Sequence, residues 1–393
     1  MAESSPLLNG LLLAVSVCIC VAMAEVAARL VFPVLTESGD FYAPDEAYLF
    51  LPRPGGVMTR KIPLLQGGEK IVEHRVSSQG FRDVEHGVKE PGEFRVLMLG
   101  DSFLEGFAVA PEDSIPKIAE TLLRADGPLR KISVVNGGVP GGGPLQALGM
   151  LRLRGLPLEP NLVVLCLYTG NDFANSLEAA GKRFRAFDME WHRRLLKWRA
   201  QSSLPCRIER ALQKHFRLYS LTSSATGRDL VMEFSCNFRF FRTPVPPRPG
   251  QPEDRTPLVE MDLREWYPEL DLACVLLEGE ILEMREECGK RGIGFAVCCV
   301  EDAIEMDGNE WLKHTARAPG GAAAYERHKA LRVAEEFLRR EGISHFPVME
   351  DIRALDNVLD AYYRFDGHFS ELGNRLVARR IADYVREKYL GGR

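Results

Sequence analysis

Four short stretches of the 393-residue sequence carry the residue types of a nucleophilic site. The letters GDS (100–102) and GND (170–172) each end an apolar run, NGGVPGGGP spans residues 136–144, and FDGH (365–368) lies near the C-terminus. They supply a hydroxyl, a side-chain amide, a glycine loop with free backbone N–H groups, and an imidazole with a carboxylate close by. Together these groups are typical of acyl transfer.

Ser102 is the candidate nucleophile. A serine hydroxyl reacts well only when a neighbouring base takes its proton, and His368 is the candidate base. Across one intervening residue, Asp366 is placed to fix the tautomer of that imidazole and to stabilise its charged form. The backbone N–H groups of Ser102 and Gly141 and the amide of Asn171 are the candidate donors to the oxyanion that forms on the substrate. The sequence therefore predicts a Ser-His-Asp site with an oxyanion hole.

Each stretch taken alone has a plainer interpretation. A GDS at a strand end is more often a turn, a glycine run is a tight loop, and a GND is a helix cap. A single histidine is usually a surface or core residue. Seven other histidines lack comparable neighbours in the sequence: His74, His86, His192, His215, His314, His328 and His345. The occurrence of all four stretches, in order and at successive strand ends, favours the catalytic interpretation.

Continuous apolar runs predict the strands that position these groups. The runs are FRVLML (94–99), KISVVN (131–136), NLVVLCLY (161–168), IGFAVCCV (293–300) and ISHFPV (343–348). Apolar residues that do not alternate with polar ones indicate strands covered on both faces, as in a parallel sheet between helices. Ligands bind such sheets beyond the carboxyl ends of the strands, where the candidate residues lie.

Helical periodicity separates these strands. Amphipathic helices are predicted at 113–124, 270–291 and 326–340, and a closing helix follows Phe369. The fold class is therefore α/β, with one doubly wound parallel sheet. The lead-in at 34–92 is rich in Pro, Gly and aromatic residues, contains one predicted strand in KIVEHRVSS, and is expected to pack on the domain at 93–390.

The N-terminal segment, residues 1–33, is directed to a membrane. Leu7–Ala24 holds eighteen residues without a charge, at the lower limit for crossing a bilayer. An Ala-Met-Ala sequence at 22–24 fits a cleavage site, but the flank before the run has Glu3 and no Lys or Arg, so we expect an uncleaved anchor rather than a signal peptide. The nearest downstream cations favour a cytoplasmic C-terminal side, and so the side of the membrane stays open.

A basic segment interrupts the α/β pattern. Residues 182–242 hold fourteen Lys and Arg against five Asp and Glu, within a longer insertion at about 182–267 that ends in a Pro-rich linker. One interpretation is an amphipathic surface for anionic lipid or an anionic polymer; the other is a helical insertion that covers the site, with solvated arginines. The net charge of -5 gives no general attraction to nucleic acid.

Cysteine spacing indicates neither a zinc site nor a disulfide framework. Nine cysteines are present without a CxxC or a His/Cys ligand pattern, and their odd number downstream of the apolar segment fits a reducing compartment. Cys298 and Cys299 lie inside an apolar run and are predicted to be core residues.

The four stretches RVLMLGDSF, VVNGGVPGGG, LYTGND and FDGHFSELGN resemble, in order, blocks of the SGNH (GDSL-like) hydrolases. The resemblance covers roughly 93–178 and 268–390, and VSSQGFRD after an apolar N-terminus is similar to the membrane-anchored bacterial branch. It implies a three-layer α/β/α fold and activity on acyl esters without metal or cofactor. It also implies an exported catalytic domain, periplasmic or extracellular, with Ser102, His368 and Asp366 as the catalytic residues and Gly141 and Asn171 in the oxyanion hole.

Two positions depart from the family pattern. Phe103 stands where GDSL has leucine, and Asp366 and His368 are separated by one residue where many members have two. If the Asp366 carboxylate does not reach the imidazole of His368, Asp360 or a backbone carbonyl is the alternative orienting group. Three functions remain open: an esterase that deacylates an envelope carbohydrate or lipid, an O-acetyltransferase with the same site acting on an exopolysaccharide, and a non-catalytic anchored scaffold that binds an anionic polymer.

Overall fold

The computed structural model describes residues 6–31, 41–64, 67–125, 131–181, 259–316, 318, 320–364 and 366–391. The basic segment at 182–242 and the Pro-rich linker lie outside the described residues, so their predicted roles stay predictions. The division of the chain into segments at 1–33, 34–92 and 93–390 likewise stays a prediction.

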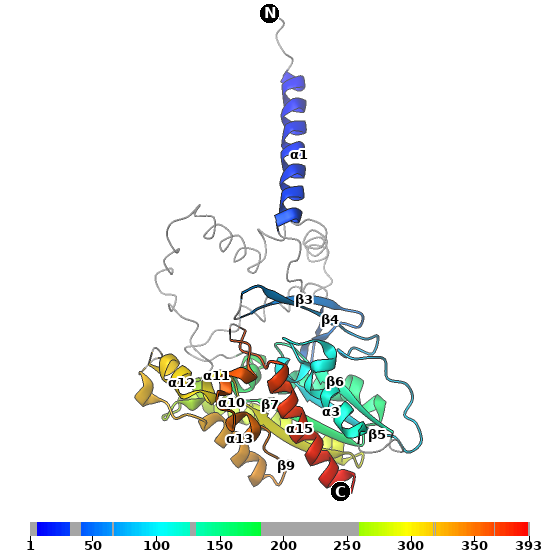
Figure 1. The fold of residues 1–393 in the computed structure, drawn as a ribbon, viewed down its shortest axis with the longest axis vertical. Coiled ribbons are helices and arrows are strands. Elements are labelled where there is room, and N and C mark those ends of the chain that lie inside the picture. The colour runs from blue at the N-terminus through cyan, green and yellow to red at the C-terminus, as the bar shows by residue number, and fades with distance from the viewer. Residues whose placement is uncertain are drawn as a thin grey trace, which may run out of the picture.

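A parallel sheet of five strands forms the centre of the molecule, in the order β6-β5-β7-β8-β9 (Figure 1). This confirms the predicted doubly wound α/β fold. The strands are β5 Phe94–Gly100, β6 Ile132–Gly138, β7 Leu162–Tyr168, β8 Gly294–Val300 and β9 Ser344–His345. The fifth is shorter than predicted, because only Ser344 and His345 pair with β8.

Helices cover both faces of the sheet and make three layers. Alternate residues of β5 show the division: Leu97 and Leu99 enter one hydrophobic cluster with α4, α5, α10 and α13, whereas Val96 and Met98 enter the other with α3, α14 and α15. Burial on both faces is the reason for the unbroken apolar runs. The helices are α3 Ile115–Arg124, α4 Pro144–Met150, α5 Asp172–Ala179, α10 Pro268–Gly289, α11 Ala303–Met306, α12 Gly308–Thr315, α13 Lys329–Arg340, α14 Glu350–Arg353 and α15 Glu371–Tyr389.

The lead-in contains more regular structure than the sequence predicted. Two antiparallel hairpins form there, β1 Tyr42–Asp45 with β2 Leu49–Pro52 and β3 Val57–Pro63 with β4 Glu69–Arg75. Only β4 was expected. The partner strand β3 was missed because VMTRKIP reads as polar, although Met58 and Ile62 alternate inward and are 0% and 1% exposed. Residues of both hairpins share the core cluster of the sheet, so the lead-in has no separate interior.

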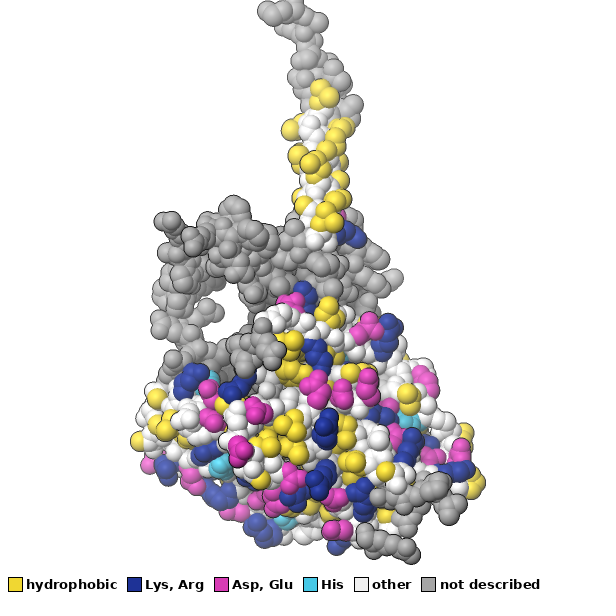
Figure 2. All heavy atoms as spheres, in the orientation of Figure 1, with side chains coloured by type: hydrophobic (Ala, Val, Ile, Leu, Met, Phe, Trp, Pro, Cys, Tyr) yellow, Lys and Arg dark blue, Asp and Glu magenta, His cyan; other side chains and the backbone are white. Residues whose placement is uncertain are grey.

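The N-terminal helix α1, Pro6–Val31, extends away from the α/β domain (Figure 1). Large hydrophobic side chains from Leu12 to Leu30 are exposed along it (Figure 2). The stretch Leu12–Leu30 is long and apolar enough to cross a membrane, with a mean hydropathy of 2.0, and it runs beyond the Ala24 predicted as its end. A helix at this place fits an anchor or a signal sequence, and it does not define the side of the membrane.

The strand order determines where a ligand fits. From β5 the chain crosses to β6 on one side and then to β7 on the other, so β5 marks the position where the winding reverses. The carboxyl ends of these three strands meet at one edge, which is the general ligand position in sheets of this topology.

Candidate active site

A tight turn at the end of β5 presents the serine. Asp101 caps the short helix α2, Ser102–Glu105, by accepting the Phe103 backbone N–H through Oδ1 at 2.8 Å. Ser102 is the first residue of this helix and is 8% exposed. The turn packs directly on β6, because a Cβ added at Gly138 would lie 2.5 Å from the backbone nitrogen of Glu105. The glycine run therefore begins inside β6, not in a loop as predicted, and makes room for the serine turn.

A second tight turn presents the histidine. Tyr362 and Phe369 pair as an isolated antiparallel bridge that closes the loop, and between them Gly367 adopts a left-handed φ of 86°. The chain turns back there, so that Oδ1 of Asp366 accepts both the Nδ1–H of His368 at 2.5 Å and its backbone N–H at 3.4 Å. A spacer of one residue thus allows the Asp-His contact. The alternative orienting residue, Asp360, instead accepts a hydrogen bond from Asn357.

The serine and the histidine meet across the top of the sheet. Ser102 Oγ lies 2.8 Å from Nε2 of His368, although the two residues are 266 positions apart in the chain. Two aromatic rings hold the imidazole: the ring centroids of Phe103 and Phe107 lie 5.1 and 4.7 Å from that of His368. Phe103, which replaces the leucine of GDSL, therefore packs on the histidine. Ser102, His368 and Asp366 form one hydrogen-bonded chain.

The three candidate oxyanion donors lie at the ends of β5, β6 and β7. The backbone N–H groups of Ser102 and Gly141 donate to no acceptor within the described part of the chain. Asn171 is the N-cap residue of α5, and its Oδ1 accepts a hydrogen bond from Nδ2 of Asn175 at 3.3 Å. The Nδ2 of Asn171 lies on the other side of the same amide group and takes no part in this contact. The same Asn175 Nδ2 donates to the carbonyl of Gly142 at 2.5 Å. Asn175, which the sequence did not single out, thus links the glycine loop to Asn171.

Electrostatics separate the roles of the buried carboxyls. Burial opposes ionisation of Asp366, but the adjacent His368 and the Arg60 guanidinium together hold its pKa below the ordinary value. Burial raises the pKa of Asp101 to about 6, and the hydrogen bond from the Phe103 backbone and the charge of His368 offset this only in part. Burial, reinforced by the charge of Asp101, also raises the pKa of Asp172. Of these three acids, only Asp366 has a pKa lowered by its contact with the imidazole, as an orienting group requires.

A buried network from the lead-in supports the serine turn. His74 on β4 contacts Oε1 of Glu105 through Nδ1 at 2.7 Å and the Phe107 carbonyl through Nε2 at 3.1 Å. Arg82 donates to the carbonyls of Glu105 and Gly106, each at 2.8 Å. The charges of Arg82 and His74 outweigh burial and lower the pKa of Glu105. The sequence did not single out His74, because its carboxylate partner Glu105 is 31 positions away in the chain.

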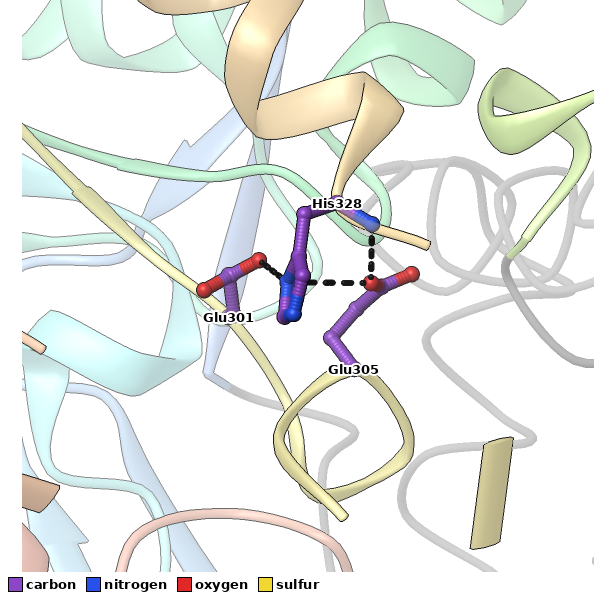
Figure 3. Close-up of side chains that lie close together, drawn as sticks. All are labelled: Glu301, Glu305 and His328. Atoms are coloured by element: carbon purple, nitrogen blue, oxygen red, sulfur yellow. Dashed lines mark hydrogen bonds and ion pairs between the residues drawn. The ribbon is translucent and has the colours of Figure 1, made fainter. Parts of the chain in front are cut away.

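A second histidine, His328, also contacts carboxylates that are distant in the chain. Nδ1 of His328 lies 2.6 Å from Oε1 of Glu301, and Glu305 accepts the His328 backbone N–H at 3.0 Å (Figure 3). Their donor atoms lie within 4.8 Å of one another, close enough for a metal ion. However, Glu301 also accepts from Arg353 at 2.5 Å, and burial with nearby acids raises the pKa of Glu305 to about 11. The hydrogen bonds of Glu301 and Glu305 join the end of β8 and the loop after it to the start of α13.

The remaining predictions for individual residues concern the cysteines. Cys298 and Cys299 are 1% and 7% exposed, which confirms them as core residues. The seven cysteines in the described part of the chain are all free thiols.

Comparison with known proteins gives structural similarity only. No family model matches the chain, and no curated protein gives a significant sequence match. Among solved structures, a lipase/acylhydrolase from Enterococcus faecalis is similar with a TM-score of 0.39 and 13% identity over 74% of this chain and 95% of that one. A putative lipolytic protein of the G-D-S-L family from Desulfitobacterium hafniense is similar with a TM-score of 0.37 and 12% identity, over 73% of this chain and 97% of that one. The acetyl xylan esterase AlAXEase is similar with a TM-score of 0.37 and 13% identity, over 74% of this chain and 100% of that one. Similarity this low does not establish a shared activity.

Proposed function

We propose that this protein is a serine-dependent acyl-ester hydrolase of the SGNH type. The single observation that supports it best is the continuous hydrogen-bonded chain from Ser102 Oγ through His368 to Asp366, at 2.8 and 2.5 Å. A plain turn or a structural histidine has no need of this alignment. The neighbouring strand ends add backbone donors for which the described residues supply no acceptor, and such donors are the further requirement of acyl transfer.

The reaction begins when Ser102 Oγ attacks the ester carbonyl carbon and its proton passes to Nε2 of His368. Asp366 stabilises the imidazolium, and the N–H groups of Ser102 and Gly141 with the Asn171 amide receive the negative oxygen. His368 then returns the proton to the leaving alcohol as the carbon–oxygen bond breaks, which gives an acyl-enzyme. A water molecule, deprotonated by His368, attacks the acyl-enzyme and releases the carboxylic acid and free Ser102.

The test uses the full-length chain in detergent. We expect it to hydrolyse p-nitrophenyl acetate and to be labelled by a fluorophosphonate, with both lost in Ser102→Ala. His368→Ala should lower kcat by several orders of magnitude. Absence of labelling in folded wild-type protein would refute the assignment of Ser102. Adding an oligosaccharide to the same assay and looking for acetylated sugar distinguishes hydrolysis from transfer to a hydroxyl.

We also propose that α1 anchors the hydrolase in a membrane, with the catalytic domain outside the cytoplasm. The proposal rests on the exposed apolar helix and on the family resemblance of the sequence. Fusions at the C-terminus to alkaline phosphatase and to a cytoplasmic fluorescent protein report the side directly. An active fluorescent fusion with an inactive phosphatase fusion would refute an exported domain.

A further inference from the structure

Arg60, in the middle of β3, places a guanidinium against the ring that packs on His368, with no bonding partner among the described residues. Its Cζ lies 4.5 Å from the ring centroid of Phe107, the same ring that packs on His368. Its Nε is buried and unpaired, and none of its side-chain nitrogens makes a hydrogen bond or an ion pair within the described residues. The residue as a whole is partly exposed, although its Nε is buried.

The groups around Arg60 that are able to accept a hydrogen bond are engaged elsewhere. Glu105 is held by His74 and Arg82. Asp366 is held by His368, and the hydroxyl of Tyr42 donates to the Pro140 carbonyl at 2.8 Å. Their charges act on Arg60 only from a distance, and burial still lowers its pKa. Leaving a buried guanidinium nitrogen such as the Arg60 Nε without an acceptor is costly, and since the described residues supply none, an oxygen of a bound ligand would satisfy it.

The position of Arg60 defines where that acceptor lies. A single aromatic ring, Phe107, separates the guanidinium from the imidazole of His368. Tyr42, next to Arg60, contacts the glycine loop through Pro140. Arg60 therefore lies near the histidine turn and near Tyr42, the residue that contacts the glycine loop. An oxyanion on Arg60 would lie across the Phe107 ring from the imidazole of His368.

We propose that Arg60 binds an oxyanion of the substrate, namely a carboxylate, phosphate or sulfate close to the scissile ester. The planar guanidinium matches such groups in bidentate geometry, and water exclusion strengthens the pair. The substrate class is therefore an acyl ester of a negatively charged molecule, either an acidic sugar or a phospholipid. This inference depends on the proposed hydrolase function for its catalytic part. A purely structural Arg60 would instead affect charged and neutral esters alike.

The kinetic test compares matched esters. One pair, 4-acetoxybenzoate and its methyl ester, differs by a charge on the alcohol side; the other, p-nitrophenyl hemisuccinate and p-nitrophenyl butyrate, differs by a charge on the acyl side. We expect wild-type enzyme to prefer the charged member of at least one pair. Arg60→Gln should lower kcat/KM for that member ~10- to 100-fold more than for its neutral partner, mainly through KM, and Arg60→Lys should recover part of the loss.

Lys61→Gln is the control, because it removes the same charge from the next position of β3, where Lys61 pairs with Glu69 at 3.1 Å. Lys61→Gln should leave kcat/KM unchanged for both members of each ester pair. Wild-type enzyme without a preference for either charged ester, or an equal loss on both members in Arg60→Gln, would overturn the proposal. The same comparison with an O-acetylated uronic acid and with lysophosphatidic acid, each against a neutral counterpart, assigns the anion to a sugar or to a phospholipid.

A binding measurement separates this proposal from the hydrolase function. In Ser102→Ala, 4-hydroxybenzoate should raise the Tm, and the rise should vanish in the Ser102→Ala/Arg60→Gln double variant. An equal rise in both proteins would overturn the oxyanion site. If the rise depends on Arg60 while wild-type protein hydrolyses no ester, the hydrolase proposal fails and the oxyanion site stands.

Discussion

Gly367 is the position where the active-site geometry depends most directly on one residue. It lies between Asp366 and His368 with a φ of 86°, and an added Cβ would meet nothing within 4 Å. Gly367→Ala therefore introduces no clash, and its cost is that of holding a side chain in the left-handed region, about 1–2 kcal/mol. That strain has to appear either as a rearranged turn or as a less stable protein.

We expect the turn to rearrange. It is held by a few backbone bonds, from Gly367 N–H to the Tyr363 carbonyl at 2.7 Å and from Tyr363 N–H to the His368 carbonyl at 2.8 Å. A cost of one to two kcal/mol reduces the population of the competent turn, and hence kcat, roughly 5- to 30-fold. KM for p-nitrophenyl acetate should change little. Gly367→Asn should keep most of the activity, because asparagine tolerates the left-handed region.

Gly342→Ala is the matched control. Gly342 follows α13 with a φ of 64° and also has open space around a built Cβ. It should lower the free energy of unfolding by a similar amount and leave kcat unchanged. The measurements are steady-state hydrolysis and denaturant unfolding on each variant. Gly367→Ala with wild-type kcat and wild-type stability would refute the reasoning, as would a fall in kcat of equal size in Gly342→Ala.

Three further predictions concern the groups around the catalytic chain. Asp366→Asn should lower kcat by roughly 10⁴ with the fold intact, because the imidazole of His368 loses the group that fixes its tautomer and stabilises its charge. A loss of kcat below tenfold in the ester assay would show that another residue orients His368. Asn175→Ala removes the residue that joins Asn171 to the Gly142 carbonyl, so kcat should fall by up to about 100-fold while KM stays nearly constant. A change in KM alone would contradict a role for Asn175 in positioning the oxyanion donors. The lowered pKa of Glu105 gives stability that is present above its ordinary value of 4.5 and lost as the pH falls through the folded pKa. The Tm difference between wild type and Glu105→Gln should therefore shrink below pH 4.5, and parallel Tm curves would contradict this.

The sequence determined the parts of the site that are encoded locally. Unbroken apolar runs occur because β5, β6 and β7 are buried on both faces, and the polar letters after them mark the strand ends. Because parallel strands have their carboxyl ends at one edge, Ser102 and Asn171 were predictable as neighbours without coordinates. The spacing of Asp366 and His368 was also visible, although its consequence was not.

The tertiary structure decided what depends on contacts between distant segments. No periodicity reports that β3 and β4 pack beside the serine turn, so neither Arg60 nor the His74 contact with Glu105 was predictable. The left-handed turn at Gly367 resolved how a one-residue spacer aligns Asp366 with His368. The physical reason is the same throughout: hydrophobic patterning fixes which face of an element is buried, whereas the polar partner of a buried group is set by the packing of elements far apart in the chain.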